Sequence, residues 1–345
     1  MSQKVCCGID FHKRTSTLCF IDQDGKHQET VTIASEKLPL YLSNRKDLLV
    51  GIEASGGTND VVQKLKDRGI EVRIINPNKF RAIGLGGKKT DERDAKAIAE
   101  ALRLNYIPEV HHKSIYARRL KTMIVGREML VRSRVNMVNH VRGTLREYGI
   151  SMPVGMDKFQ SEVNEAIKKI ECEFIRGHLQ DLVGRISDMI KRQIEMEGQL
   201  ENLASEDPRC ELLRTVPGIG LMTAVTFVAV IDDYQRFADG KHFASYIGLV
   251  PREHSSGDRR RMGSITRSGS ELLRRYFIHG ARSVLMHTKE KTAEKDRNRS
   301  WALKLKARIG MNKATVALAH RLSRIAFAIV RDGLEYGKQK ENRAS

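Results

Sequence analysis

The first hundred residues alternate apolar runs of strand length with polar stretches of helical period. Residues 4–34 hold apolar runs separated by polar turns, including an Asp-Gly hairpin signal, so this segment predicts a β-meander. Apolar runs at 48–57 and 71–77 predict two further strands, and residues 59–68 between them predict an amphipathic helix. A meander followed by strand–helix alternation predicts an α/β domain.

The segment after the glycines at 84–87 begins like a capped helix. Thr90 suits the N-cap position, and Asp91 falls in the first turn. Asp91 and Asp94 are three residues apart, so both carboxylates lie on one face of that helix. The expected apolar stripe consists of Ala95, Ile98, Ala99 and Leu102. A charged surface helix would explain this stretch taken alone, but two like charges so close also favour a divalent cation.

The second half of the chain has a mainly helical pattern. Residues 114–148 predict one long basic helix or a bent pair. Within residues 158–206, apolar positions recur by three and four over about four heptads. This seam predicts a coiled-coil dimerisation arm, with a helix packed on its own chain as the alternative. Residues 271–286 and 314–330 predict further helices, and the mixed-charge residues 289–312 are expected to be partly mobile.

These patterns divide the 345 residues into four expected segments. They are a catalytic α/β domain over 1–155, a coiled-coil arm over 156–206, a mainly α C-terminal domain over 207–337 and a disordered tail over 338–345.

Net charge, the length of apolar runs and the cysteine spacing indicate which partners and which cellular compartment to expect. A net charge of +19 predicts a polyanionic partner, most simply nucleic acid, although an anionic membrane surface would attract the same charge. No apolar run reaches the roughly 18 residues of a spanning helix, and Asp10 interrupts any signal-peptide pattern. Five cysteines without C-x-x-C spacing argue against zinc sites and a disulfide framework. We therefore expect a reduced, cytoplasmic protein without a membrane partner.

Two of the expected core strands end in an acid, Asp10 and Glu53. Packing explains this poorly, because a buried carboxylate is costly without a partner. Together with Asp91 and Asp94 these acids form a set of four that suits two Mg²⁺ ions, with Mn²⁺ as the other option.

Five motifs, taken in order along nearly the whole chain, resemble a single family. They are GIDFHK at 8–13, GIEASGG at 51–57, KTDERDAKAIA at 89–99, VPGIG at 216–220 and the segment from FASYIGLVPREHSSG to SELLRRYF at 243–277. This pattern resembles the DEDD-type insertion-sequence transposases, recombinases to which pilin-gene invertases are related. The resemblance implies a RuvC-like, ribonuclease H-like N-terminal domain in which Asp10, Glu53, Asp91 and Asp94 are the catalytic, metal-binding acids. It also implies strand exchange between donor and target double-stranded DNA, and a structured guide RNA from the element.

A serine pair followed by a glycine lies among arginines at residues 252–261. Taken alone, a Ser-Gly turn with solvated arginines is the better explanation. The resemblance implies instead that Ser255 is a nucleophile that forms a covalent phosphoserine–DNA intermediate, with Ser256 as the second choice. A serine hydroxyl needs activation, and no Ser–His–Asp spacing is visible, so we expect a metal ion beside the hydroxyl to activate it. The implied site is composite, with acids from the N-terminal domain and a serine from the C-terminal domain.

Basic and glycine-rich positions supply the expected nucleic-acid interface. The long basic helix is expected to contact a phosphate backbone, because its positive charge is dense and lies next to the predicted metal site. The VPGIG stretch resembles a helix-hairpin-helix turn, whose backbone N–H groups bind phosphate; a tight turn between two core helices is the alternative. The residues expected to contact nucleic acid are Lys13, Lys88, Lys89, Arg118, Arg119, Arg127, Gly218, Gly220, Arg252, Arg259, Arg260, Arg261 and Arg267.

Our principal hypothesis is a DNA recombinase of a mobile element that works as a dimer or tetramer through the coiled coil. A metal-dependent nuclease or Holliday junction resolvase that uses water would share the four acids. A non-catalytic nucleic-acid-binding scaffold would share the basic charge. An actin-like sugar kinase is disfavoured, because no glycine-rich phosphate loops follow the later strands.

Overall fold

The structure is a computed structural model that describes residues 4–45, 47–81, 90–253, 261–294 and 296–338. By their internal contacts the residues form two compact units, 1–113 and 114–345. The long basic helix belongs to the second unit by this division, whereas the sequence analysis assigned it to the catalytic domain. The domain boundaries drawn from the sequence stay predictions.

The first unit is built on one six-stranded sheet with the order β3-β2-β1-β4-β5-β6. Its strands are β1 (Val5–Phe11), β2 (Thr15–Ile21), β3 (His27–Ala34), β4 (Leu48–Glu53), β5 (Glu71–Ile75) and β6 (Glu109–Val110). The first three strands form an antiparallel meander; β4 runs parallel to β1, β5 runs parallel to β4, and β6 is antiparallel to β5. The predicted meander and both predicted strands are confirmed.

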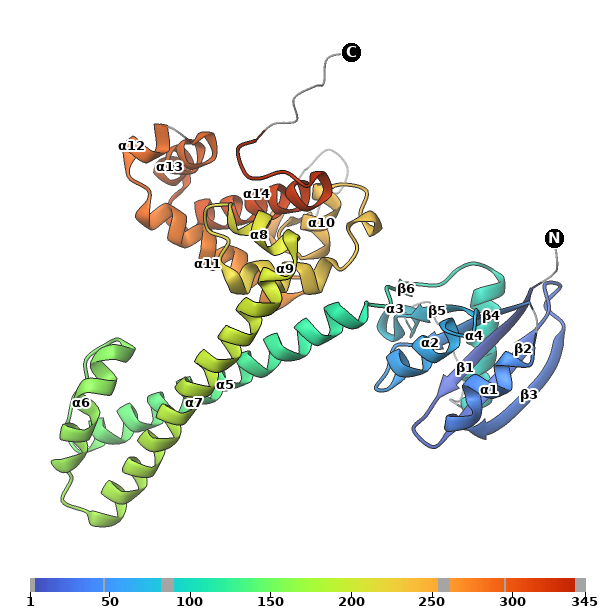
Figure 1. Ribbon diagram of the computed structural model, residues 1–345, viewed down its shortest axis with the longest axis horizontal. Coiled ribbons are helices and arrows are strands. Elements are labelled where there is room, and N and C mark those ends of the chain that lie inside the picture. Colours follow the sequence, from blue (N-terminus) through green and yellow to red (C-terminus); the bar gives the residue numbers. More distant parts are fainter. Residues whose placement is uncertain (1–3, 46, 82–89, 254–260, 295, 339–345) are drawn as a thin grey trace. The chain divides into compact units, whose positions relative to one another are not determined.

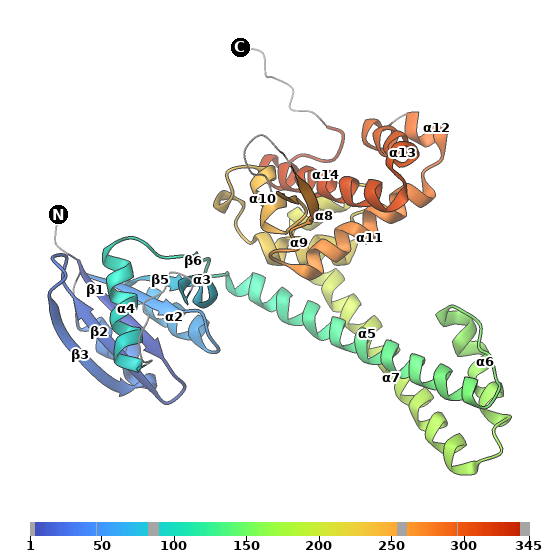
Figure 2. The ribbon, with the colours of Figure 1, turned by 180° about the vertical axis from the view of Figure 1, so that it is seen from behind.

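Helices cover both faces of this sheet (Figures 1 and 2). They are α1 (Leu38–Ser43), preceded by a short 3₁₀ turn η1 (Ser35–Lys37), α2 (Thr58–Lys66), α3 (Pro77–Arg81) and α4 (Asp91–Arg103). One apolar core joins β1 residues Cys7 and Ile9 to α1 and α2, and a smaller cluster joins Cys19 and Ile21 of β2 to the buried alanines of α4. Because successive side chains of a strand point to opposite faces, Gly8 and Asp10 of β1 lie on the α4 side.

The second unit is helical apart from one small hairpin. Its helices are α5 (Ile115–Glu147), α6 (Met156–Lys168), α7 (Glu173–Ser205), α8 (Pro208–Arg214), α9 (Leu221–Ile231), a 3₁₀ turn η2 (Tyr234–Arg236), α10 (Gly240–Tyr246), α11 (Glu271–His287), α12 (Glu290–Glu294), α13 (Arg297–Ile309) and α14 (Met311–Asp332). The hairpin pairs β7 (Pro251–Glu253) with β8 (Met262–Ile265). The described part of residues 289–312 is largely helical, and α13 buries Ala302 and Leu305 and begins at the N-cap Asp296. The expected partial mobility of this segment stays a prediction.

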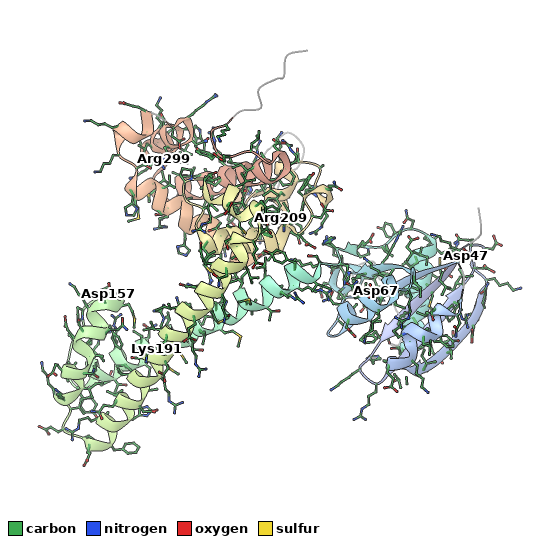
Figure 3. All side chains as sticks on the ribbon, viewed as in Figure 1. Asp47, Asp67, Asp157, Lys191, Arg209 and Arg299 are labelled. Carbon is green, nitrogen blue, oxygen red and sulfur yellow. The ribbon has the colours of Figure 1, made fainter. Side chains whose placement is uncertain are left out.

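The two 33-residue helices α5 and α7 lie side by side (Figures 1 and 2). The seam residues Leu179, Ile186 and Leu200 of α7 are buried within the unit itself. These three side chains therefore pack against their own chain, as the alternative interpretation expected. Assembly of several chains through the arm stays a prediction. The exposed residues of α7 are mostly polar, such as Lys191 (labelled in Figure 3), but they include the apolar Phe174 and Ile194.

Two separate apolar cores hold the second unit together. One surrounds α9, whose residues are buried from Thr223 to Ile231, and it takes in α8, α11 and α14. The other lies at the far end of the α5–α7 pair, where Val141 and Leu145 of α5 pack with α6 and with Leu179 of α7.

A charged network ties α5 and α7 to α11. Glu128 of α5 is buried, accepts a hydrogen bond from the Tyr276 hydroxyl (2.5 Å) and is ion-paired with Arg275. Arg127 reaches Glu128 (2.8 Å) and Glu197 of α7 (2.6 Å). Burial by itself raises the pKa of Glu128, but the Tyr276 hydrogen bond and the charges of Arg275 and Arg127 bring that pKa below its ordinary value.

Candidate active site

Two parallel strands, β1 and β4, each carry an acidic residue near their carboxyl ends, at the same edge of the sheet. Their register pairs Gly8 with Gly51 and Ile9 with Ile52, so Asp10 and Glu53 follow as the next residues on the two neighbouring strands. Each strand therefore carries the same three-residue unit, a glycine, an isoleucine and an acid. Within each unit the isoleucine faces the apolar core, and the glycine and the acid face the opposite side.

The two glycines let helix α4 lie directly on the sheet. A Cβ atom on Gly8 would stand 2.0 Å from the carbonyl oxygen of Ala95, and one on Gly51 would stand 2.7 Å from a methyl group of Leu102. Any larger side chain at either position would push the helix away. The glycine that precedes each acid by two residues thus sets the distance between α4 and the acids of the strands.

The first turn of α4 brings two further carboxylates to this edge. Thr90 caps the helix, because its hydroxyl accepts a hydrogen bond from the backbone N–H of Arg93 (3.3 Å). Asp91 and Asp94 follow in the first turn, as the sequence predicts, and the buried stripe of α4 is the predicted set Ala95, Ile98, Ala99 and Leu102. The cap and the stripe together orient this turn toward β1.

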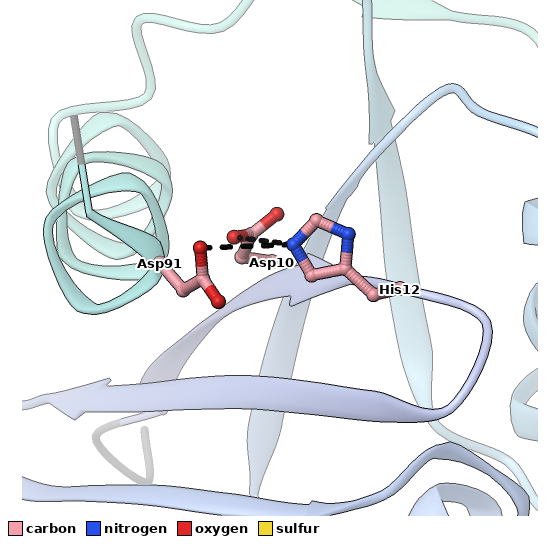
Figure 4. A group of neighbouring side chains, drawn as sticks. All are labelled: Asp10, His12 and Asp91. Atoms are coloured by element: carbon pink, nitrogen blue, oxygen red, sulfur yellow. Dashed lines mark hydrogen bonds and ion pairs between the residues drawn. The ribbon is translucent and has the colours of Figure 1, made fainter.

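Asp10, His12 and Asp91 converge there (Figure 4). His12 Nε2 lies 3.2 Å from Asp10 Oδ2 and 3.8 Å from Asp91 Oδ1, and one ligand atom from each residue falls within 4.8 Å of the others. The Asp10 side chain is 19% exposed, against 65% for Asp91. Burial raises the pKa of Asp10, His12 works against that rise, and the charges of Asp91 and Asp94 add to it.

This donor set fits a divalent cation. Carboxylate oxygens are the preferred ligands of Mg²⁺ and Mn²⁺, and imidazole is a common ligand of other divalent transition metals. A cation would also offset the repulsion that raises the pKa of Asp10. The charge of Asp94, a half-buried residue of α4, adds to that repulsion. Glu53, the last residue of β4, is also half-buried.

His12 is the member of this cluster that the sequence analysis did not assign to the metal site. The sequence analysis named only its neighbour Lys13, as a nucleic-acid contact. The sequence did contain one indication of a role for His12 in the metal site. His12 follows Asp10 by two residues, which places both side chains on the same side of the chain at the end of β1. Lys13 is exposed in the turn that follows.

The second expected reactive group, Ser255, lies outside the described residues, as do Ser256, Lys88, Lys89, Arg259 and Arg260. What the structure does describe are the residues on either side. β7 ends at Glu253 and β8 begins at Met262, and these two residues are paired across the hairpin. The Ser255 segment therefore connects the two paired strands.

The expected nucleic-acid contacts fall into two groups. Arg119, Arg252, Arg261 and Arg267 are exposed, and Arg118 is half-buried. Arg127 is different, because its guanidinium is 15% exposed and already bonded to Glu128 and Glu197. We correct its assignment from a surface phosphate contact to an internal ion pair.

Packing explains one of the two glycines of the VPGIG turn, Gly218, but not the other, Gly220. Gly218 has φ near +90°, and a Cβ on it would lie 2.9 Å from the carbonyl oxygen of Gly280 in α11. Gly220 caps α9 and has open space around it. The tight turn between core helices accounts for Gly218, whereas a phosphate contact at Gly220 stays a prediction.

Comparison with known proteins finds transposase models that match both halves of the chain. A family model described as a transposase of DEDD type matches residues 7–150, and one described as "Transposase IS116/IS110/IS902 family" matches residues 210–296. The transposase for insertion sequence element IS1111A of Coxiella burnetii is 32% identical over 94% of this chain and 88% of that protein. A probable family 20 transposase of Pseudomonas aeruginosa is 32% identical over 82% of this chain and 83% of its own length.

A pilin gene-inverting protein of Moraxella lacunata is 30% identical over 79% of this chain and 80% of that protein. Among the residues that the structure describes, no helix is long and apolar enough to cross a membrane. The identity across nearly the full length and the two matching models show that the chain belongs to the IS110/IS116 family of DEDD-type transposases.

Proposed function

We propose that this transposase recombines DNA through two kinds of group: the acids Asp10, Glu53, Asp91 and Asp94, which hold divalent metal ions, and the hydroxyl of Ser255, which attacks the DNA. The proposal of a metal site rests on one observation: ligand atoms of Asp10, His12 and Asp91 lie within 4.8 Å of one another at one edge of the sheet. The N-terminal unit is proposed to be ribonuclease H-like, since its meander and strand–helix order are what such a domain requires.

The acids have a defined task in this proposal. When bound, Mg²⁺ or Mn²⁺ supplies positive charge that offsets the charge developing on phosphoryl oxygens. Asp10 and Glu53 come from rigid strands and Asp91 and Asp94 from a capped helix, so their carboxylates are held in place before the ion arrives. His12 lies beside Asp10 and is proposed to orient that carboxylate or to bind the ion as a further ligand.

Ser255 is proposed to act on the scissile phosphodiester. Its Oγ–P bond forms as a P–O bond of the DNA strand breaks, the hydroxyl loses its proton, and the leaving strand ends in a free hydroxyl after gaining one. The energy of the phosphodiester is kept in the serine–DNA bond, so a second DNA hydroxyl can reverse the step at a new junction. That reversal distinguishes recombination from hydrolysis by water.

The remaining parts of the proposal concern partners. Donor and target double-stranded DNA would be bound through the basic residues, and a structured RNA from the element would select them. Assembly as a dimer or tetramer through the coiled-coil arm over residues 156–206 would bring the acids of the N-terminal unit and the serine of the C-terminal one to the same DNA. The reaction would take place in the cytoplasm.

The test is a covalent trap. The full chain is expressed with its element, cells are lysed in detergent, and DNA that stays attached to the denatured protein is sequenced. We expect attached DNA with wild type and with Ser283→Ala, an exposed serine of α11, and none with Ser255→Ala. Attached DNA that persists in the double variant Ser255→Ala with Ser256→Ala contradicts the serine mechanism and indicates another protein nucleophile. Strand cleavage by wild type without any attached DNA favours a water-using nuclease.

The RNA part has a separate test. RNA that co-purifies with the chain under native conditions is sequenced. A discrete transcript from beside the coding gene supports guidance, whereas only a broad sample of cellular RNA contradicts it.

A further inference from the structure

The second unit contains a large cleft that none of the residues discussed above for catalysis explains. It has a volume of about 1880 Å³ and is lined by α14, by α11 and α13, by the start of α10 and by the β7–β8 hairpin. Small-molecule sites in proteins span roughly 300–1,000 Å³. The size of this cleft therefore suits a segment of a polymer better than a metabolite.

One face of α14 forms a long wall of this cleft. The lining residues recur every three or four positions, which places them on a single side of the helix. They are Lys313, Val316, Ala317, His320, Arg321, Arg324, Ile325, Ala328 and Arg331. From Lys313 to Arg331 this face spans about 27 Å at the helical rise of about 1.5 Å per residue. Cationic and small apolar side chains alternate along it.

Several cations of the cleft have no salt bridge to the described part of the chain. Lys241 of α10 and Lys313 and Arg324 of α14 are in this group. The carboxylate of Asp239 is near enough that a backbone hydrogen bond from His242, together with the charges of Lys241 and Arg324, lowers its pKa. Arg321 is fixed differently, because its guanidinium lies over the ring of Trp301, 4.6 Å from the centroid. This cation–π contact holds the positive charge in place at the cleft wall.

Other charged residues of the lining have structural roles. Arg274 donates to the carbonyl oxygens of Ile247 (3.0 Å) and Ser268 (2.7 Å), and Arg331 pairs with Asp332. Two acids, Asp239 and Glu271, also line the cleft. Cations still outnumber acids, so the cleft as a whole favours an anionic ligand.

The combination of charge and apolar surface indicates which anion. A duplex presents phosphates outward and keeps its bases paired, so it needs charge but little apolar surface. A single strand exposes both its phosphates and the faces of its bases, and its binding sites combine cations with apolar or aromatic surface. The α14 wall offers Val316, Ala317, Ile325 and Ala328 between its cations, and Trp301 stands beside them.

We propose that this cleft binds a single strand of nucleic acid, with phosphates at Lys241, Lys313 and Arg324 and bases against the apolar residues of α14. The inference rests on the proposed function only in that the partner is nucleic acid. The strands β7 and β8, which flank the Ser255 segment, form part of the cleft, so a strand bound in it would leave the cleft beside that hairpin.

The chain provides its own probe for this site. Trp301 is the single tryptophan of the sequence and lines the cleft. Oligonucleotides of about 20 residues, longer than the roughly 4–16 nucleotides that one single-strand site covers, are titrated into Ser255→Ala chain without divalent metal. This variant measures binding without strand cleavage. The result therefore stays valid even if the covalent trap shows that Ser255 is not the nucleophile. Oligo-dT, oligo-U and a dA·dT duplex of equal length are compared by Trp301 emission and by anisotropy of a labelled strand.

We expect both single strands to change Trp301 emission and to bind at least tenfold more tightly than the duplex. A preference for oligo-dT assigns the cleft to DNA and a preference for oligo-U assigns it to RNA. Binding seen by anisotropy without any change at Trp301, or tighter binding of the duplex, overturns the proposal.

A pair of triple variants supplies the control. Lys241→Ala with Lys313→Ala and Arg324→Ala removes three cleft charges, and Lys304→Ala with Lys306→Ala and Arg308→Ala removes three exposed charges of α13 outside the cleft. Each phosphate contact contributes about 0.7 to the slope of log affinity against log salt for single strands. The cleft variant is expected to lower that slope by about 2 and the α13 variant by less than about 1. Equal losses in the two variants would show general charge attraction and would refute the site.

Discussion

The carbonyl oxygen of Ala95 stands 2.0 Å from the point where a side chain on Gly8 would begin. Helix α4 and strand β1 therefore touch backbone to backbone. Asp10 follows Gly8 by two residues, and Asp91 precedes Ala95 by one helical turn. The contact between a glycine and a helix thus fixes how closely the carboxylates of two separate elements approach each other.

Replacing Gly8 by alanine tests this relationship. The added methyl group has to displace α4, so we expect a loss of about 1–3 kcal/mol in the free energy of unfolding, as for other overpacked cores. Because the acids would separate, recombination in cells is expected to fail although all four remain. Chemical unfolding followed by circular dichroism measures the first effect. Gly56→Ala, which has open space around it, is the control and should change stability little.

Removal of the buried charge at Asp10 should separate stability from function. The raised pKa means that the ionised carboxylate destabilises the fold at neutral pH, so Asp10→Asn is expected to unfold at a higher temperature than wild type in EDTA. Added Mg²⁺ should raise the melting temperature of wild type, since a ligand at 100 times its Kd adds about 2.7 kcal/mol. Added Mg²⁺ should not change the melting temperature of Asp10→Asn.

Glu92→Gln serves as the matched control, because Glu92 is an exposed acid of the same helical turn. This variant should keep the full response to Mg²⁺. An equal response in Asp10→Asn would place the ion elsewhere.

The buried Glu128 predicts a pH dependence of stability. Its pKa in the fold is lower than in the unfolded chain, where it is about 4.3, so its contribution is complete above that value. The contribution is lost as pH falls through the lower, folded pKa. At pH 7, Glu128→Gln is expected to cost about 3 kcal/mol, since Arg127 and Arg275 lose the carboxylate they share.

Unfolding free energies of wild type and Glu128→Gln should therefore converge as the pH is lowered below about 4. The exposed pair of Glu201 and Arg214 provides the comparison, and Glu201→Gln should cost at most about 1 kcal/mol. A constant difference across pH would rule out the proposed ionic origin.

Helix α11 contains a glycine whose role is packing. A Cβ on Gly280 would lie 1.9 Å from the carbonyl oxygen of Gly218, so Gly280→Ala is expected to destabilise the second unit by about 1–3 kcal/mol. Gly198→Ala on α7 meets nothing and should stabilise by up to about 1 kcal/mol, as alanine favours helix. Trp301 fluorescence during urea unfolding reports both changes, and equal effects would contradict the contact.

Local patterns in the sequence were sufficient for most of the N-terminal unit. The Thr90 cap, the stripe from Ala95 to Leu102 and the strands that carry Asp10 and Glu53 depend on neighbours in sequence, and all are confirmed, although β1 continues one residue beyond Asp10. His12 was missed because its partner Asp91 lies far along the chain, and pairing of that kind depends on where α4 packs.

Similar reasons explain the corrections in the second unit. Arg127 looked like one of many cations on a basic helix, but its partner Glu197 comes from α7, seventy positions away. The seam of α7 has the same period whether its partner is another chain or α5, so periodicity could not choose between them. The cleft along α14 could not be predicted from the sequence either, because its walls come from six separate elements.

The far end of the α5–α7 pair has an apolar core of its own, distinct from the one around α9. A region that buries its own side chains can be exchanged as a block without repacking the remainder. Among related mobile elements, this end is therefore the natural junction for chimeras: grafting it from one relative onto another would transfer its surface while leaving the chemistry of the host untouched.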